Sequence, residues 1–513
     1  MKIFLFTIFI SLFTFSSNAQ ITFQKKYGFT GSEFGWCVQQ TSDKGYIMVG
    51  ETDVAPYNSD VYLVKTDSVG SLLWTKTYGG QFWDGGRSVQ QTPDGGYIVA
   101  GYSESFSSDT SNDVYVIRTD SIGDTLWTRT YGGTGYQVGT SVKQTADGGF
   151  IIGGTYLIKI DANGAIIWVK TYSNNIGISS VQQTADSGYI FIGGGTGVNS
   201  SLDVYLMKTD VSGIQLWTKT FGGTGFENGY SFQQTTDGGY IIAGVTNTFS
   251  PTSAVYLIRT DSVGNSLWTK TYGLTGQGNI GNSVQQATDG GFFITGSTSG
   301  PISQADTPNV YLIKTDTIGN LLWSKTYGRS SLAHGLCGQQ TADGGYIAVG
   351  YITNYPPGAE YIYLIKTDAN GNSGCYEKNI ITLATSPPTI VTNPSVITYS
   401  LIIPVHAPAS VVGFGGIDTA LCISVGINEL STANLFFISP NPSTGNFTIL
   451  LEGIIFKGKV EILNIIGETI FTENIFNESK KEINLKNVSD GIYFVKVFDG
   501  EKSYCKKLII EHD

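Results

Sequence analysis

Residues 21–28 read Ile-Thr-Phe-Gln-Lys-Lys-Tyr-Gly, and this stretch decides between an open array of repeats and a closed ring. It matches a phrase that recurs as Leu-Trp-Thr-Lys-Thr-Tyr-Gly, with Phe23 in the Trp position and Tyr27 in the Tyr position. The longer phrase that contains it begins at Thr66, Thr119, Ile160, Thr209, Thr260 and Thr315. A seventh copy starts at Thr367, but Cys375 stands where the Trp is due and no Thr-Tyr-Gly follows. The N-terminal stretch therefore supplies the part that the last repeat lacks.

A second phrase, Gln-Gln-Thr-x-Asp-Gly-Gly-Tyr-Ile-Ile-x-Gly, accompanies the first. Its seven copies begin at Gln39, Gln90, Lys143, Gln182, Gln233, Gln285 and Gln339. The period is about fifty residues, except in the third unit, where the loss falls between Gly154 and Tyr156 and shortens a loop. A period of this length is typical of propellers and repeat arrays.

Each unit reads as four short strands joined by tight turns. In the second unit we expect strands over 88–92, 97–101, 114–119 and 126–131. These segments alternate in polarity and are rich in β-branched and aromatic residues, while Asp and Gly fill the turns. Four antiparallel strands per repeat form the blade of a β-propeller. With residues 21–28 in the last blade, the sequence predicts an all-β protein with a seven-bladed β-propeller closed by the N-terminal strand, which leaves no exposed edge at the ends of the array.

The N-terminus, MKIFLFTIFISLFTFSSNAQ, predicts a secretory signal over 1–19 that is cut between Ala19 and Gln20. No later apolar run reaches the length that a membrane-spanning helix needs, so we expect an exported protein that is not integral to a membrane. The 513 residues carry a formal net charge of −11, which argues against a nucleic-acid partner.

The third turn of each unit resembles the tryptophan-docking motif of quinoprotein propellers, as in Asp210, Gly213 and Trp217. In that family the motif ties each blade to its neighbour. The Asp-to-Gly step is one residue shorter here, and only the architecture is carried over. The blade repeat as a whole looks like those of uncharacterised secreted propeller proteins.

After the propeller, assigned to residues 20–375, residues 376–427 change to Thr, Pro, Val and Ile with almost no charge. We expect an extended connector that is partly β. Cys375 and Cys422 bracket it, and in an oxidising compartment they could pair.

Residues 428–513 resemble the type A C-terminal sorting domain of the type IX (Por) secretion system of Gram-negative bacteria. The resemblance rests on Ser439–Thr448, Val460–Gly467, Ile483–Leu485, Gly491–Val497 and Lys506–Ile510, in the family's order. It implies a small Ig-like β-sandwich, recognition by the type IX machinery, and a location in the medium or on the outer-membrane surface, reached through the periplasm. Alternating strands and Asp-Gly and Pro-Asn-Pro turns independently indicate a small antiparallel β domain.

No catalytic constellation is visible. The three His, at 334, 406 and 512, are dispersed, and His334 is assigned to a loop between blades. The repeated Asp of the turns is explained by hydrogen bonding to the turn backbone, so we expect no metal site and no cofactor. Cys37 and Cys337 occupy equivalent positions in the first and last blades, and we expect two free thiols, since their Cβ vectors should not converge.

Function is expected where the blades differ. The first and third turns share a monotonous face, whereas the second turns and blade-to-blade loops share a variable one. The candidate binding residues on the variable face are Tyr57, Trp83, Arg87, Tyr102, Phe106, Tyr136, Phe226, Glu227, Phe249, His334 and Tyr355. Aromatic residues on loops over a rigid scaffold suit recognition of a glycan or a protein. We therefore expect a monomeric, non-enzymatic binding protein; the alternatives are an extracellular hydrolase or lyase with a site at the ring centre, and a structural adhesin or matrix component.

Overall fold

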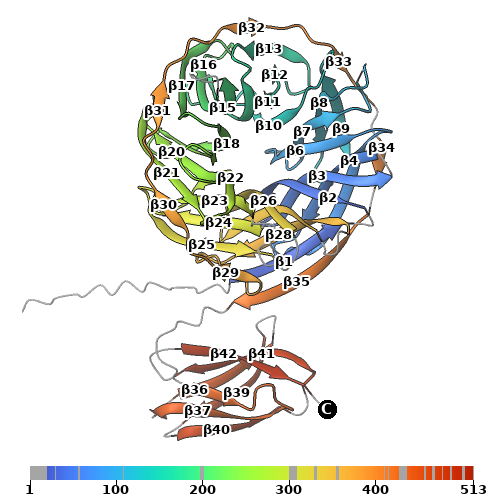
Figure 1. Ribbon diagram of the computed structural model, residues 1–513. Coiled ribbons are helices and arrows are strands. Elements are labelled where there is room, and N and C mark those ends of the chain that lie inside the picture. The colour runs from blue at the N-terminus through green and yellow to red at the C-terminus, as the bar shows by residue number, and fades with distance from the viewer. Residues whose placement is uncertain are drawn as a thin grey trace, which may run out of the picture. The chain divides into compact units, whose positions relative to one another are not determined.

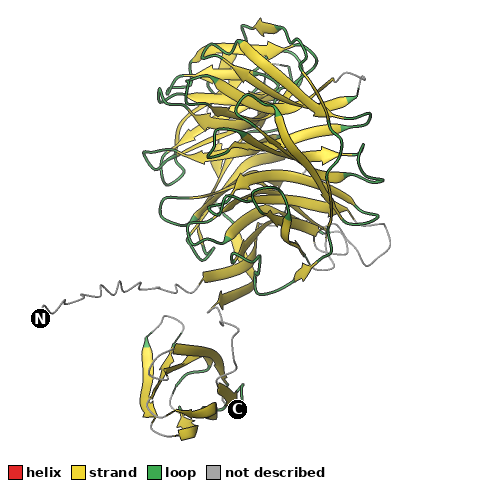
Figure 2. Cartoon of the chain, turned by 90° about the vertical axis from the view of Figure 1, so that its left-hand side faces the viewer, coloured by secondary structure: helices red, strands yellow, loops and turns green. Residues whose placement is uncertain are grey.

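The computed structural model describes residues 20–511 apart from 29–30, 56–57, 108, 197–200, 300–308, 329–331, 354–357, 409–410, 414, 427–435, 456–457, 465–467, 476–477, 486–487 and 499–502. The signal segment, with Ala19 of the expected cleavage site, lies outside the described residues. The chain divides into two compact units, one comprising Ile21–Ser424 and the other the C-terminal residues from Val425. The described residues form strands and loops (Figure 2). Among them, nothing helical is long or apolar enough to cross a membrane.

The first unit consists of seven five-stranded sheets set around a central axis (Figure 1). Blade 1 contains β2 (Glu33–Gln40), β3 (Tyr46–Ala55), β4 (Asn58–Thr66), β5 (Leu72–Gly79) and β34 (Val411–Gly413). Blade 2 contains β6 (Asp84–Gln91), β7 (Tyr97–Ser103), β8 (Asp113–Thr119), β9 (Thr125–Tyr131) and β33 (Val405–His406). Blade 3 contains β10 (Gly139–Gln144), β11 (Phe150–Gly154), β12 (Leu157–Ile160), β13 (Ile166–Tyr172) and β32 (Thr398–Ser400). Blade 4 contains β14 (Gly177–Gln183), β15 (Tyr189–Thr196), β16 (Leu202–Thr209), β17 (Gln215–Gly222) and β31 (Ile390–Thr392).

The remaining three blades repeat the same order of strands. Blade 5 contains β18 (Glu227–Gln234), β19 (Tyr240–Thr246), β20 (Ala254–Thr260), β21 (Ser266–Gly273) and β30 (Leu383–Thr385). Blade 6 contains β22 (Gly278–Gln286), β23 (Phe292–Ser299), β24 (Asn309–Thr315), β25 (Leu321–Tyr327) and β29 (Glu377–Asn379). Blade 7 contains β26 (Leu332–Gln340), β27 (Tyr346–Thr353), β28 (Glu360–Thr367), β1 (Gln20–Gly28) and β35 (Ile417–Gly426).

The N-terminal strand completes the last blade, which confirms the predicted ring closure. Strand β1 runs antiparallel to β28, with Phe23 opposite Lys366 and Tyr27 opposite Ile362. Blade 1 has the same register, with Trp74 opposite Lys65. Residues 21–28 therefore occupy the same place in blade 7 that the matching phrase of the repeat occupies in blade 1.

The segment expected as a connector encircles the ring. Strand β29 pairs with β25 of blade 6, and the chain then passes blades 5, 4, 3, 2 and 1 in turn before β35 lies beside β1 in blade 7 (Figure 1). We call residues 377–426 the belt. Each belt strand is the outermost strand of its sheet, where the frequent prolines cost no ladder hydrogen bond. Its threonines bond to the blades, as Thr385 does to Thr271 through hydroxyls 2.6 Å apart.

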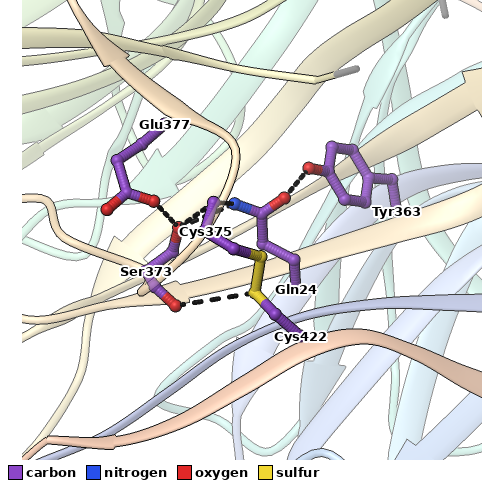
Figure 3. The surroundings of a disulfide bond; sticks show 6 residues. All are labelled: Gln24, Tyr363, Ser373, Cys375, Glu377 and Cys422. Atoms are coloured by element: carbon purple, nitrogen blue, oxygen red, sulfur yellow. Dashed lines mark hydrogen bonds between the residues drawn. A yellow bond between two sulfur atoms is a disulfide. The ribbon is translucent and has the colours of Figure 1, made fainter.

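A disulfide joins the two ends of the belt (Figure 3). Cys375 precedes β29 and Cys422 lies in β35, 47 positions later, with Cα atoms 6.3 Å apart. Gln24 of β1 is buried beside the bond and donates to the Ser373 hydroxyl at 2.7 Å and to the Cys375 carbonyl. Tyr363 of β28 donates in turn to Gln24. Blade 7, the N-terminal strand and the belt are thus fastened at one place.

Two contacts of the repeat phrase dock each blade onto the next. Gly213 of the third turn in blade 4 adopts a φ of +75°, and an added Cβ there would lie 2.9 Å from the Trp168 ring of blade 3. The corresponding glycine of every other blade meets the preceding blade's Trp in the same way, and in blade 1 it meets Phe23. The fourth-strand tyrosines donate to the carbonyls of these glycines, as Tyr172 does to Gly213 at 2.8 Å. The Trp and Gly positions of the repeat therefore dock each blade onto its neighbour, as the resemblance to the tryptophan-docking motif implies.

The second unit is a small all-β fold of two sheets. One sheet has the order β36 (Phe436–Ser439), β37 (Asn446–Ile455), β40 (Glu478–Asn484), and the other β39 (Thr469–Ile475), β38 (Gly458–Leu463), β41 (Gly491–Phe498), β42 (Ser503–Ile510). Phe447 of the first sheet and Val460 and Val495 of the second belong to one buried core. The two sheets pack face to face, as expected for a β-sandwich.

Candidate binding face

The face formed by the first and third turns is occupied by internal contacts. A basic residue on the third strand of every blade pairs with the Asp of the first turn; Lys65 and Asp43, 2.8 Å apart, are one example. Asp67 of a third turn accepts backbone N–H groups of Val69 and Ser71 at 3.0 and 2.7 Å. The turn aspartates are therefore used by the turns, as predicted from the sequence.

A hollow of about 660 Å³ lies on this face, over the inner ends of blades 1 to 3. It is lined by the paired glutamines and by turn residues. Gln39 accepts the backbone N–H of Gln91 at 2.6 Å, and Gln91 accepts that of Ser42 at 2.8 Å. The side-chain nitrogen of Gln91 is also hydrogen-bonded, since it donates to the Gly95 carbonyl. The glutamines hold the blades together and offer a ligand few free groups.

The second turns and blade-to-blade loops meet on the opposite face. Glu104 of a second turn donates its N–H to Trp83 of the preceding loop at 2.8 Å, and Asn247 donates to Phe226 at 3.0 Å. Trp83, Tyr136 and Phe226 are 45%, 76% and 36% exposed. These three predicted residues present aromatic rings to solvent from three different loops.

The other predicted residues are placed differently. Tyr57 and Tyr355 lie outside the described residues. Phe106 and Phe249 are partly buried against Tyr115 and Tyr256 and pack the loops onto the blades.

Glu227 is fully buried, so its prediction as an exposed binding group is wrong. Its carboxylate accepts the N–H of Gly223 at 2.9 Å and the hydroxyl of Thr246 at 2.7 Å. It begins the inner strand of blade 5, and a Cβ added to Gly222 of blade 4 would lie 3.0 Å from its Oε2 atom. Glu227 is therefore part of the scaffold.

Arg87 is the centre of a cluster that bridges blades 1 and 2. Its guanidinium carbon lies 3.7 Å from the centroid of the Trp36 ring and 5.2 Å from that of Tyr102. Glu51 lies 3.7 Å from Arg87 Nη1, accepts from the Trp36 indole at 3.2 Å, and accepts from the Tyr102 hydroxyl at 2.7 Å. Burial and the Glu51 charge raise the pKa of Tyr102, which stays protonated as a donor. We call Trp36, Glu51, Arg87 and Tyr102 the Arg87 cluster.

The Arg87 cluster depends on a feature that the sequence analysis missed. In each inner strand one residue forms a β-bulge, at Trp36, Arg87, Thr140, Ser179, Tyr230, Asn282 and Leu336. All seven side chains are partly exposed, and they belong to the strands that surround the ring axis (Figure 1). Bulges re-aim side chains and are frequent beside functional sites. The signal was present, because the position three residues before the first Gln differs in all seven repeats.

The seam between blades 7 and 1 carries a second aromatic group. His334 lies on β26 rather than in a loop, which corrects its assignment, and it stacks on Tyr351 at 4.8 Å. Burial lowers the pKa of His334, so it is neutral at pH 7. Phe34 packs edge-on against Tyr351 from blade 1.

Cys37 and Cys337 are both free thiols, as predicted, but their Sγ atoms lie 3.7 Å apart, so the side chains do converge and the reason for the prediction was wrong. The Cys337 thiol donates to Cys37 and lowers the pKa of the Cys37 thiol. Five other blades have Ser at this position, and there the Ser88 hydroxyl accepts the N–H of Val142 as Cys337 accepts that of Val38. Cys337 therefore makes the same contact between neighbouring inner strands that Ser88 makes.

Within the described part of the chain, no group of three or more His, Cys, Asp or Glu side chains is placed to share a metal ion. Asp60 and Asp84 form a convergent carboxylate pair, but at 8% and 0% exposure they are closed to a substrate.

Comparison with known proteins assigns the second unit. Residues 438–511 match the secretion system C-terminal sorting domain, Por_Secre_tail. Comparison of the sequence with curated proteins gives no match. Among solved structures, Sqt1 from Chaetomium thermophilum is similar at 9% identity over 69% of this chain and 88% of that chain, with a TM-score of 0.40. The protein is an exported seven-bladed β-propeller that carries a Por-type C-terminal sorting domain of the type IX secretion system.

Proposed function

We propose that the propeller is an extracellular, non-enzymatic binding protein that recognises a glycan on the face of its second turns and blade-to-blade loops. The observation that carries this proposal is the Arg87 cluster, in which the Arg87 guanidinium stacks on Trp36 and lies beside Glu51. Arg87 and Trp36 both occupy the inner-strand position that differs in every blade. Sugars place their C–H faces on aromatic rings and their hydroxyls on charged or amide groups. The cluster offers both kinds of contact.

The distribution of exposed aromatic rings supports a glycan over a protein. Trp83, Tyr136 and Phe226 are exposed on three separate loops. A stable protein interface would need about 800 Å² on this partner with a dry centre. Separate aromatic contacts at intervals suit an extended polysaccharide instead.

A glycan array probed with the mature chain, residues 20–513, tests the proposal. We expect binding to a related set of glycans, and loss of that binding in Arg87→Ala. Leu126→Ala is the matched control, because Leu126 is 58% exposed on a fourth strand, away from the variable loops. An array without a signal, or hydrolysis of a bound glycan, would contradict the proposal.

A further inference from the structure

The junction of blades 1 and 2 contains three buried side-chain oxygens without a hydrogen-bond partner. They are the Oδ1 atoms of Asn58, Asp60 and Asp84. Asn58 and Asp60 lie two residues apart on β4, and therefore on the same face of the strand, while Asp84 begins β6 of the next blade. Buried polar oxygens are nearly always paired, so three in one junction call for an explanation.

The two carboxylates converge on the backbone of Gly79. A Cβ added there would lie 2.0 Å from Asp60 Oδ1 and 2.7 Å from Asp84 Oδ2, and because these distances add to 4.7 Å, the two oxygens can be no farther apart. Neither carboxylate has a Lys or Arg partner within the described residues. The junction thus holds more negative charge than its surroundings compensate.

Two equivalent junctions have different side chains at the positions of Asp60 and Asp84. Between blades 4 and 5, Glu227 takes the place of Asp84, and both of its oxygens accept hydrogen bonds. Between blades 2 and 3, Asp113 takes the place of Asp60, but Gln137 replaces the second carboxylate and its amide is bonded to the loop. The Asp113 carboxylate also has buried oxygens without a hydrogen-bond partner, but of these three junctions only the one between blades 1 and 2 has such an oxygen on each of two carboxylates.

We propose that this junction binds a calcium ion through the side-chain oxygens of Asn58, Asp60 and Asp84. Two carboxylates and a neutral amide oxygen are ligands typical of Ca²⁺, and waters or backbone carbonyls complete such sites. The Ser103 and Ser105 hydroxyls lie beside the Asp84 carboxyl and hold its orientation. An affinity of about 10⁻⁴–10⁻³ M, usual for extracellular modules, is expected.

The ion would also order the loop that carries Trp83. Gly80 donates its N–H to Asp84 Oδ2 at 2.8 Å, and its carbonyl accepts from Asn58 Nδ2 at 3.1 Å. Phe82 donates its N–H to Ser105, which donates to Asp84. Ca²⁺ therefore fixes residues 80–83, and, resting on the proposed function, it strengthens glycan binding at this loop.

Isothermal titration of the chelator-treated mature chain with CaCl₂ at pH 8 tests the site. We expect one site, lost or weakened at least about tenfold in both Asp60→Asn and Asp84→Asn. Asp203→Asn and Asp113→Asn, at the two equivalent junctions, keep wild-type Ca²⁺ affinity. Tryptophan fluorescence on thermal unfolding verifies that each variant is folded, and if Asp84→Asn is not, Asp60→Asn decides the result.

Hydrogen exchange of residues 79–84 is the second readout, expected to slow on Ca²⁺ addition in the wild type and not in Asp60→Asn. Absence of Ca²⁺ binding by the wild type, unchanged binding in Asp60→Asn, or an equal loss in Asp113→Asn would overturn the site. Because the titration contains no glycan, its failure leaves the proposed function untouched, and an empty glycan array leaves the calcium site untouched.

Discussion

The hydroxyl of Tyr27 donates to the carbonyl of Gly70 at 2.6 Å, which ties the N-terminal strand in blade 7 to the third turn of blade 1. Five other blades make the same bond to their neighbour. Blade 4 has Phe221 at this position and cannot make it. The residues that close the ring therefore use the same contact that joins the blades elsewhere.

Removal of residues 21–28 should destabilise the whole propeller. Blade 7 would lose the partner of β28, and the buried Phe23 and Tyr27 would leave a gap in the core shared with blade 1. We expect aggregation or a large drop in the unfolding temperature, measured by tryptophan fluorescence. A truncated protein that melts like the parent would show that β1 does not belong to the ring.

Milder substitutions at the same contact give the matched comparison. Tyr27→Phe should lower the free energy of unfolding by about 1 kcal/mol, because a buried hydrogen bond is lost. Phe221→Tyr should supply the missing bond to Gly264 and raise stability slightly. Equal effects of the two substitutions in the same direction would contradict this interpretation.

The disulfide of the belt should contribute substantially to stability. Cys375 and Cys422 close a loop of 47 positions, for which the chain-entropy model gives about 4 kcal/mol. The double variant Cys375→Ser/Cys422→Ser should therefore unfold at lower guanidinium concentration. All eight tryptophans lie in the propeller unit, so their fluorescence follows that unit alone. Cys37→Ser is the control, and its stability should be near that of the wild type, since Ser occupies this position in five blades. An unchanged unfolding midpoint in the double variant would show that the disulfide does not stabilise the propeller.

How much the sequence could predict differs between elements for physical reasons. Phe23 and Tyr27 were recognisable because a repeat fixes which residue occupies which contact. The belt strands have two to three residues for the most part and little alternation, so nothing in the sequence showed that they would add to blade edges. Trp36 and Arg87 come from different repeats and meet only through bulges in neighbouring blades. Glu227 was expected at the surface because its repeat neighbours are loop residues, whereas packing of the adjacent blade buries it.

Asp60 predicts a specific pH dependence in the presence of chelator. Its pKa is about 7 in the folded protein, because of burial and Asp84, and about 3.9 when unfolded. Between these values the unfolded state releases a proton that the folded state keeps, so the contribution of Asp60 to stability falls as pH rises from about 4 to 7 and stays low above.

Asp60→Asn should therefore match the wild type near pH 4 and exceed it at pH 8 by up to a few kcal/mol. Chemical unfolding of both proteins at pH 4, 6 and 8 measures this difference, and the titration of other groups cancels in the comparison. A difference that does not grow with pH would refute the assignment.

The sorting domain should act independently of the propeller. Deletion of residues 427–513 removes the domain but keeps every propeller strand, so the truncated protein should fold and accumulate in the periplasm. Conversely, residues 376–513 fused to a periplasmic reporter should carry it to the surface in a host with type IX secretion. Fractionation with protease accessibility measures both. Surface display of the truncated protein, or a reporter that stays periplasmic, would argue against the assignment.

Calorimetric titration of a glycan identified on the array tests whether the variable loops form the binding site, because it locates the binding as well as detecting it. We expect Arg87→Ala and Trp83→Ala each to weaken the affinity of the mature chain at least about tenfold, which corresponds to about 1.4 kcal/mol. Leu126→Ala should bind like the wild type. Wild-type affinity in both loop-face variants, or an equal loss in Leu126→Ala, would contradict a binding site on the face of the variable loops.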